Sequence, residues 1–285
     1  MSRDLVLATM VLVVCGAGVW LMGLVPTPHE RRDDAGIGGR ALERRSWRRL
    51  CLPMLPAAIV LATLFGWALQ EPSVTDEPLR PLAVYLAVPF ALLWLRCAAR
   101  ACLSLRRPRL MPLVATAGLI RPRILLADRL EQMLDPAALA AAVAHERAHA
   151  RHFDPLRIWL AQIMTDVQWP NPAARLRLDR WLVSLELARD EEARLGGTRG
   201  EDLAAAVVAV AKMAPFATGA ALARLTGSEA ALASRIHRLL DPLRADGHVG
   251  APVVPLAIAA AIALGVVAGV EHGDLFLRAF PFIAT

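Results

Sequence analysis

Four long apolar runs constrain this chain more than any other feature of its sequence. Leu5–Val25, Cys51–Leu69 and Pro252–Val270 contain no charged residue, and Pro81–Leu95 continues past two arginines to Leu103. A helix needs about 20 apolar residues to cross the hydrocarbon core of a bilayer, and long arginine side chains near its end can snorkel to the surface. The alternative, four buried core helices, fits poorly with a chain that is 56% hydrophobic. We therefore expect four transmembrane helices.

The arginines between these runs predict how the helices are oriented. Residues 26–50 hold seven arginines, residues 70–80 hold one against three acids, and five more follow the third run without an acid among them. Because basic loops stay in the cytosol, both termini should be external and the long third connection cytosolic. Nucleic-acid binding is the other interpretation of a net charge of +6. It is disfavoured because the basic residues flank the runs and form no single stripe.

These spans divide the chain into three segments. Residues 1–103 would hold three spans and a basic cytosolic loop, residues 104–250 a cytosolic domain, and residues 251–285 the fourth span and a short external tail. Capping and turn residues in the cytosolic domain predict two short strands around Gly118 and Pro122 and then five helices. The helices are expected over Asp135–Phe153, Asp154–Trp169, Pro172–Leu195, Glu201–Met213 and Ser228–Leu240. The four cysteines show no metal-ligand spacing, and we expect them only to pack.

The stretch AVAHERAHARHFDP places metal-binding and acid–base side chains in the middle of this largely apolar chain. His145 and His149 are four residues apart on the predicted helix, so both imidazoles project from one face and can bind a single zinc ion. Glu146 lies about 100° further round the helix, where it can take a proton from water at the metal. HERAH is therefore the HExxH pattern of zinc peptidases. The alternative is a solvated helix face with incidental histidines.

A catalytic zinc ion needs a third protein ligand, and SLELARDEE offers one in Glu186. Its neighbours Leu185 and Leu187 predict an apolar environment, where an unpaired carboxylate would be costly and a metal ion would remove that cost. Asp190 lies one helical turn later and could accept the second N–H of a ligand histidine. The alternative is that Glu186 is a surface carboxylate near Arg189.

Several motifs together resemble those of BlaR/MecR-type integral-membrane zinc metallopeptidases. HERAHARHFD is similar to their HELAHIRRRD-type motif, GLIRPRILL to GLxRPxIxLP, WPNP to W-F-N-P, ELARD to E-x-A-C-D and SRIHRLL to R-I-x-R-L-L. The matches follow in a consistent order across Leu113–Leu240. Ala127 stands where the family often has proline and Arg189 where it often has cysteine, and we expect neither to touch the chemistry.

The resemblance implies a mostly α, multi-span inner-membrane protein with four transmembrane helices and a cytosolic, gluzincin-like α+β zinc-protease segment. It implies one zinc ion per chain, with His145, His149 and Glu186 as ligands and Glu146 as general base and acid. Asp190 would be the partner of His145. Asp154 is a second candidate for supporting the ligands, although we expect it rather to cap the following helix. Only 15 residues follow the last apolar run, so we expect no penicillin-binding sensor domain.

Peptide hydrolysis also requires a group that stabilises the oxyanion. The single tyrosine, Tyr85, lies in an apolar run, which leaves Arg235, His237 and His152. Arg235 is preferred because it lies in SRIHRLL. The substrate is expected to bind as an extended peptide along the edge of the strands in Leu113–Leu126, beside Ile124 and Leu125.

These features predict an integral-membrane zinc metalloendopeptidase that cleaves a cytosolic or membrane-proximal protein, in signal transduction or repressor inactivation. Its expected partners are membrane lipid and a protein substrate such as a winged-helix transcriptional repressor, with no direct binding of nucleic acid. One alternative is a housekeeping membrane protease of the prenyl-protein or heat-shock type. Another is a catalytically silent membrane scaffold or sensor, in which Glu146 would not be required.

Overall fold

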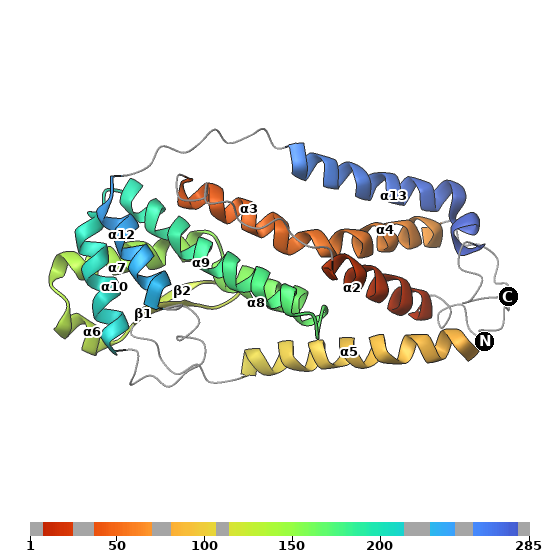
Figure 1. Ribbon diagram of the computed structural model, residues 1–285, viewed down its shortest axis with the longest axis horizontal. Helices are drawn as coiled ribbons and strands as arrows, with labels where there is room; N and C mark the ends of the chain where they lie inside the picture. The colour runs from red at the N-terminus through yellow and green to blue at the C-terminus, as the bar shows by residue number, and fades with distance from the viewer. Residues whose placement is uncertain are drawn as a thin grey trace.

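Helices make up most of the chain in the computed structural model, which describes residues 8–24, 37–69, 81–106, 114–213, 229–242 and 253–278. The molecule is elongated, with a group of apolar helices at one end and a helical domain with a small sheet at the other (Figure 1). Residues 26–36 of the predicted basic first loop, the whole acidic second loop and both chain ends lie outside the described residues.

Within the described residues the apolar runs form helices, and two of these helices are long and apolar enough to cross a membrane. The first is a continuous stack over Gly39–Leu69, and the second covers Pro81–Leu105. The stack consists of α3 (Gly39–Cys51), a 3₁₀ turn and α4 (Leu55–Leu69), and the second lies in α5 (Pro81–Arg106). The other two predicted spans correspond to shorter apolar helices over Ala8–Leu24, which includes α2 (Gly16–Leu24), and Ile258–His272, within α13 (Val253–Arg278).

Glycines allow α4 and α13 to pack closely along their length (Figure 1). A Cβ atom added at Gly269 would collide with the carbonyl oxygen of Thr63, and one added at Gly66 would collide with that of Val266. Small residues four positions apart, such as Gly265 and Gly269, are typical of helix pairs in membranes, where close backbone approach replaces the hydrophobic driving force. The packing is therefore of the kind that lipid-embedded helices use.

The predicted strands and helices of the domain are confirmed. Val114–Ala117 (β1) and Arg123–Leu126 (β2) form an antiparallel hairpin, with Thr116 opposite Ile124. One short helix was not predicted, α6 (Asp128–Met133). The remaining helices are α7 (Pro136–Arg151), α8 (Asp154–Asp166), α9 (Pro172–Leu195), α10 (Gly200–Met213) and α12 (Glu229–Leu240).

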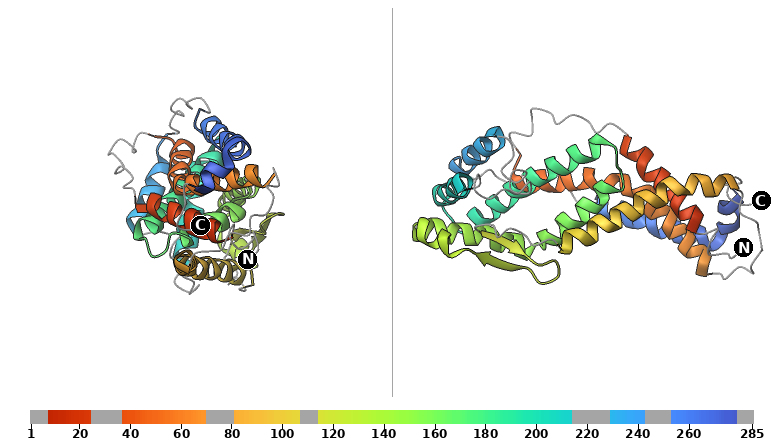
Figure 2. Two further views of the ribbon diagram at one scale, coloured as in Figure 1. Left: turned by 90° about the vertical axis from the view of Figure 1, so that its right-hand side faces the viewer. Right: turned by 90° about the horizontal axis from the view of Figure 1, so that it is seen from below.

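Helix α3 connects the two ends of the molecule. It continues α4 out of the apolar group and lies beside α9 in the domain (Figure 1, Figure 2). Leu50 of α3 is buried against Trp181 and Leu185 of α9, with Leu178 and Ala161 in the same cluster. Since large apolar side chains in such a cluster are costly to expose, this core holds α9, which carries Glu186, against α3, the helix that continues into α4.

Candidate metal centre

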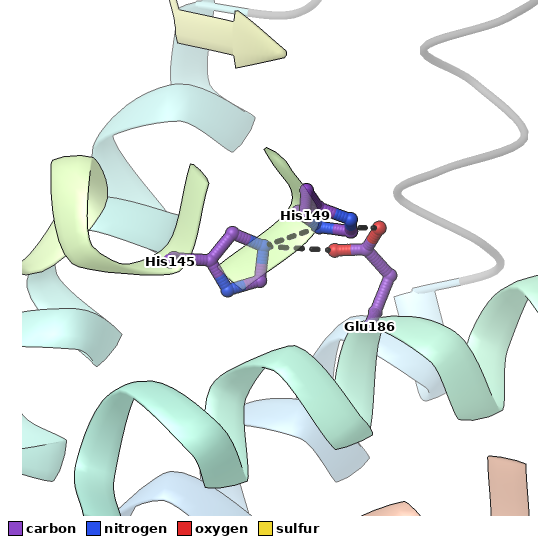
Figure 3. A group of neighbouring side chains, drawn as sticks. All are labelled: His145, His149 and Glu186. Carbon is purple, nitrogen blue, oxygen red and sulfur yellow. Dashed lines mark hydrogen bonds and ion pairs between the residues drawn. The ribbon is translucent and has the colours of Figure 1, made fainter. Parts of the chain in front are cut away.

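The three predicted metal ligands lie together between α7 and α9. His145 and His149 project from α7 toward Glu186 of α9 (Figure 3). The two Nε2 atoms are 3.0 Å apart, and each lies near one carboxylate oxygen of Glu186, at 3.4 Å for His145 and 3.6 Å for His149. Both histidines are buried and Glu186 is nearly so. The helix pair thus converges three potential ligand atoms on one point.

The second nitrogen of each imidazole faces a buried carboxylate. Nδ1 of His145 lies 2.9 Å from Oδ1 of Asp190, and Nδ1 of His149 lies 2.8 Å from Oδ2 of Asp154. An ionised carboxylate can only accept, so each neutral imidazole carries its proton on Nδ1 and exposes a lone pair at Nε2. Both lone pairs then point at each other and at Glu186.

Such an arrangement of donors fits a zinc ion. Two lone pairs and a carboxylate repel one another at these distances unless positive charge lies close to them. The guanidinium of Arg235 lies 3.0 Å from Glu186 and 3.4 Å from Nε2 of His145, and a metal ion between the three atoms would supply such charge directly. A tetrahedral ion with ligand bonds of about 2.0–2.1 Å separates its ligand atoms by about 3.3 Å, and the three observed separations are 3.0, 3.4 and 3.6 Å. His145, His149 and Glu186 are therefore candidate zinc ligands, as predicted.

The electrostatics of the cluster also favour a positive charge. Burial alone would lower the pKa of His145, but the neighbouring carboxylates of Asp190 and Glu186 outweigh it and raise that pKa to about 9. Burial would raise the pKa of Glu186, but the guanidinium of Arg235 and the two histidines hold it well below its usual range. The site thus attracts a proton where a metal ion would bind, and a zinc ion would have to displace that proton.

Glu146 is held by the hairpin. The Thr116 hydroxyl of β1 lies 2.7 Å from Oε2 of Glu146 and 2.8 Å from its carbonyl oxygen. Thr116 was not among the predicted site residues, because its position in a short strand gives no local signal of this contact. Of the predicted edge residues, Ile124 and Leu125 lie in β2, opposite Thr116 and Ala115. The strand residue that reaches Glu146 is therefore in β1.

Arg235 reaches the centre, where its guanidinium binds two carboxylates and also lies 3.4 Å from Nε2 of His145. Its Nε and one terminal nitrogen lie 2.6 and 2.8 Å from the two oxygens of Asp190. The other terminal nitrogen lies 3.0 Å from Glu186. In the described part of the chain, His237 is exposed and makes no polar contact with the ligands, and His152 lies 2.8 Å from Glu192. The structure thus brings Arg235 to the cluster but neither of these histidines, and the oxyanion role of Arg235 stays a prediction.

The prediction that Asp154 caps α8 is wrong. The cap residue is Phe153, with a left-handed φ of 53°, and no side chain caps the helix. Asp154 is fully buried and accepts hydrogen bonds from His149, Arg157 and Arg189 instead. The short turn between α7 and α8 directs this carboxylate back toward α7. The expectation that Arg189 lies apart from the chemistry is also wrong, since it binds the carboxylate that holds a ligand.

The sequence comparison agrees with this geometry. Residues 104–239 match the family model described as BlaR1 peptidase M56. No curated protein and no solved structure gives a significant match. The matched residues include the hairpin and the helices that carry all the side chains of the cluster.

Proposed function

We propose that this protein is an integral-membrane zinc metalloendopeptidase, because residues 104–239 match the family model described as BlaR1 peptidase M56 and hold His145, His149 and Glu186 as candidate zinc ligands. The observation that carries the proposal is the convergence of two imidazole lone pairs and one carboxylate within 4.8 Å of one another. A zinc ion bound there would act as a Lewis acid toward water and the peptide carbonyl.

Glu146 is the proposed general base and acid. It follows His145 directly on α7, and HExxH peptidases use the glutamate at this position to move the proton of the attacking water. Replacement of Glu146 by Gln tests the proposal directly, because it removes the base and leaves the three candidate ligands in place.

The contact from Thr116 to Glu146 supports a positioning role for β1. Thr116→Val keeps the shape of the side chain but removes the hydroxyl, so the Glu146 carboxylate loses a partner at 2.7 Å. We expect kcat to fall by about 10- to 100-fold with zinc content unchanged, since misplacing a catalytic group by about 1 Å can cost 10²-fold. Steady-state kinetics with a cleavable peptide measures this effect.

Thr116→Ser is the matched control, because it restores the hydroxyl and should recover most of the rate. Equal kcat values for Thr116→Val and the wild type would show that Thr116 does not position Glu146. A Ser variant as slow as Val would assign the effect to packing.

We propose that the substrate is a cytosolic or membrane-proximal protein, bound as an extended segment by strand addition to the hairpin near Ile124 and Leu125. The hairpin supports this because Thr116, the register partner of Ile124, contacts the proposed base. Cleavage of a winged-helix repressor would make the protein part of a signalling pathway.

Four membrane crossings are part of the proposal. Gly23 at the end of α2 accepts hydrogen bonds from Asn171 and Arg177, and Arg100 of α5 lies 3.0 Å from Asp166. Both helices thus run toward the domain, whereas α4 leaves it from the end of α3. Gly265 and Gly269 of α13 meet successive turns of α4 in the same order along the chain, so α13 runs parallel to α4 and away from the domain. These directions alternate as four crossings of an inner membrane require.

Reporter proteins at Gly197 and after Thr285 are expected to lie on opposite sides of the membrane. Gly197 lies in an exposed turn between α9 and α10, with open space around its Cβ position, so an insertion there is tolerated. A reporter active only in the cytosol should work at Gly197, and one active only outside should work at the C-terminus. Two reporters on the same side would contradict four crossings.

A further inference from the structure

One acidic side chain of α3 is buried inside the domain. Glu43 is 7% exposed, although it lies on a helix rich in arginine. Its Oε1 accepts a hydrogen bond of 3.1 Å from the indole N–H of Trp181 and a second from the guanidinium of Arg157. Burying a carboxylate costs desolvation free energy, and hydrogen-bonding and charged partners such as these offset that cost.

Arg157 connects Glu43 to the residues around the metal centre. Its guanidinium lies over the ring of Trp47, 4.8 Å from the ring centroid. Another of its nitrogens donates to Oδ1 of Asp154 at 3.1 Å. Oδ2 of Asp154 accepts from Nδ1 of the candidate ligand His149 at 2.8 Å. Four side chains thus form an unbroken path from α3 to the metal ligand.

The charges along this path balance. Glu43 and Asp154 supply two negative charges, and Arg157 and Arg189 supply two positive ones. Burial makes an unpaired charge in such a group costly. Loss of the Glu43 charge would leave Arg157 with Asp154 as its remaining carboxylate, and the guanidinium would then draw that carboxylate from the imidazole.

The two ligand histidines are held from different parts of the chain. Asp190, the partner of His145, is bound by Arg235 of α12. Asp154, the partner of His149, is bound by Arg189 of α9 and also by Arg157. Arg157 is bound in turn by Glu43, which belongs to the helix that continues into α4. Partners of a ligand imidazole set its tautomer and orientation, and their loss typically costs about 10- to 100-fold in metal affinity or activity.

We propose that Glu43 and Arg157 are positioning residues that orient the zinc ligand His149 through Asp154, so that zinc affinity depends on where α3 lies. This inference rests on the proposed zinc site and adds to it a connection between the apolar helices and the metal.

Zinc affinity of the purified full-length protein in detergent, measured by competition with a chromogenic chelator, tests the proposal. Glu43→Gln is expected to weaken zinc binding by about 10-fold, the lower end of the range for partners outside the ligand sphere. Glu191→Gln is the matched control. Glu191 also ties α3 to α9, through a 2.8 Å hydrogen bond from the Arg40 amide, but it is not on the path. The zinc affinity of the Glu191→Gln variant should equal that of the wild type.

A double-mutant cycle separates positioning from general stability. If Glu43 acts through Arg157, the variant with both Glu43→Gln and Arg157→Met should bind zinc as weakly as Arg157→Met alone. Additive losses would overturn the proposal. The melting temperature of the metal-free protein should not follow the order of the zinc affinities, and if it does, the role is merely structural.

The remaining outcomes are also decisive. A wild-type protein that binds no zinc would refute the proposed function itself. A wild-type protein that binds zinc no better than Glu43→Gln would refute only this inference. If Glu43→Gln does not fold, zinc affinity can still be compared between Arg157→Met and the double variant of Glu43→Gln with Arg157→Met, which loses one negative and one positive charge. Unequal zinc affinities of these two variants would overturn the proposal.

Discussion

Replacing Glu146 by Gln is expected to reduce proteolysis by about 10²- to 10⁴-fold, the usual contribution of a general base. The amide keeps the size and polarity of the side chain but cannot take a proton from water. His145, His149 and Glu186 remain in place, so the purified variant should still hold about one zinc ion per chain. Cleavage of a co-expressed candidate substrate and elemental analysis of the purified protein measure the two quantities.

Glu191→Gln is a suitable control for this experiment, since it makes the same chemical change at a carboxylate that touches no ligand. It should cleave at the wild-type rate. A Glu146→Gln variant that also cleaves at the wild-type rate would show that the protein is not a hydrolase of the HExxH type. Loss of both cleavage and zinc would instead mean that the substitution disturbs the ligands.

Replacing His149 by Ala should have an equally large effect, through the metal. It removes one of three ligands and the partner of the buried Asp154, so we expect zinc affinity to fall by more than about 100-fold, beyond the range for residues outside the ligand sphere. Glu186→Gln should lower affinity less, because an amide oxygen can still coordinate but the negative charge is lost. Chelator competition measures both changes.

His152→Ala provides the matched histidine control. His152 belongs to the same stretch of sequence, but it is exposed and lies 2.8 Å from Glu192, away from the ligands. It should keep full zinc affinity. Normal zinc binding by His149→Ala would mean that the metal binds elsewhere, and normal binding by Glu186→Gln would direct the search for a third ligand to Asp190 and Asp154.

Local sequence patterns predicted most of the helices and the candidate metal ligands, because helix starts and side-chain spacing depend on residues close together in the sequence. Asp135 followed by Pro136 predicts the start of α7, and the Asp135 side chain indeed accepts a hydrogen bond of 2.8 Å from the Ala138 amide. The four-residue spacing of His145 and His149 is decided by the helical repeat alone. The apolar flanks of Glu186 predicted its burial, although its meeting with α7 required the tertiary fold.

What the sequence determined by itself is therefore the apolar helices, the order of elements in the domain and the chemical identity of the metal ligands. Of the residues that hold those candidate ligands, Asp190 was predicted from the sequence as the partner of His145. The tertiary structure alone decided the other contacts: Asp154 lies against His149, Arg189 and Arg157 bind Asp154, Thr116 contacts Glu146, and Glu43 binds Arg157. Thr116 and Glu146 are 30 residues apart, and Glu43 and Arg157 are 114 apart. Periodicity and capping report only on neighbours within a few turns. Contacts between side chains far apart in the sequence depend on how α3, α7, α8 and α9 pack. This packing decides which charged side chains are buried next to one another and therefore form ion pairs.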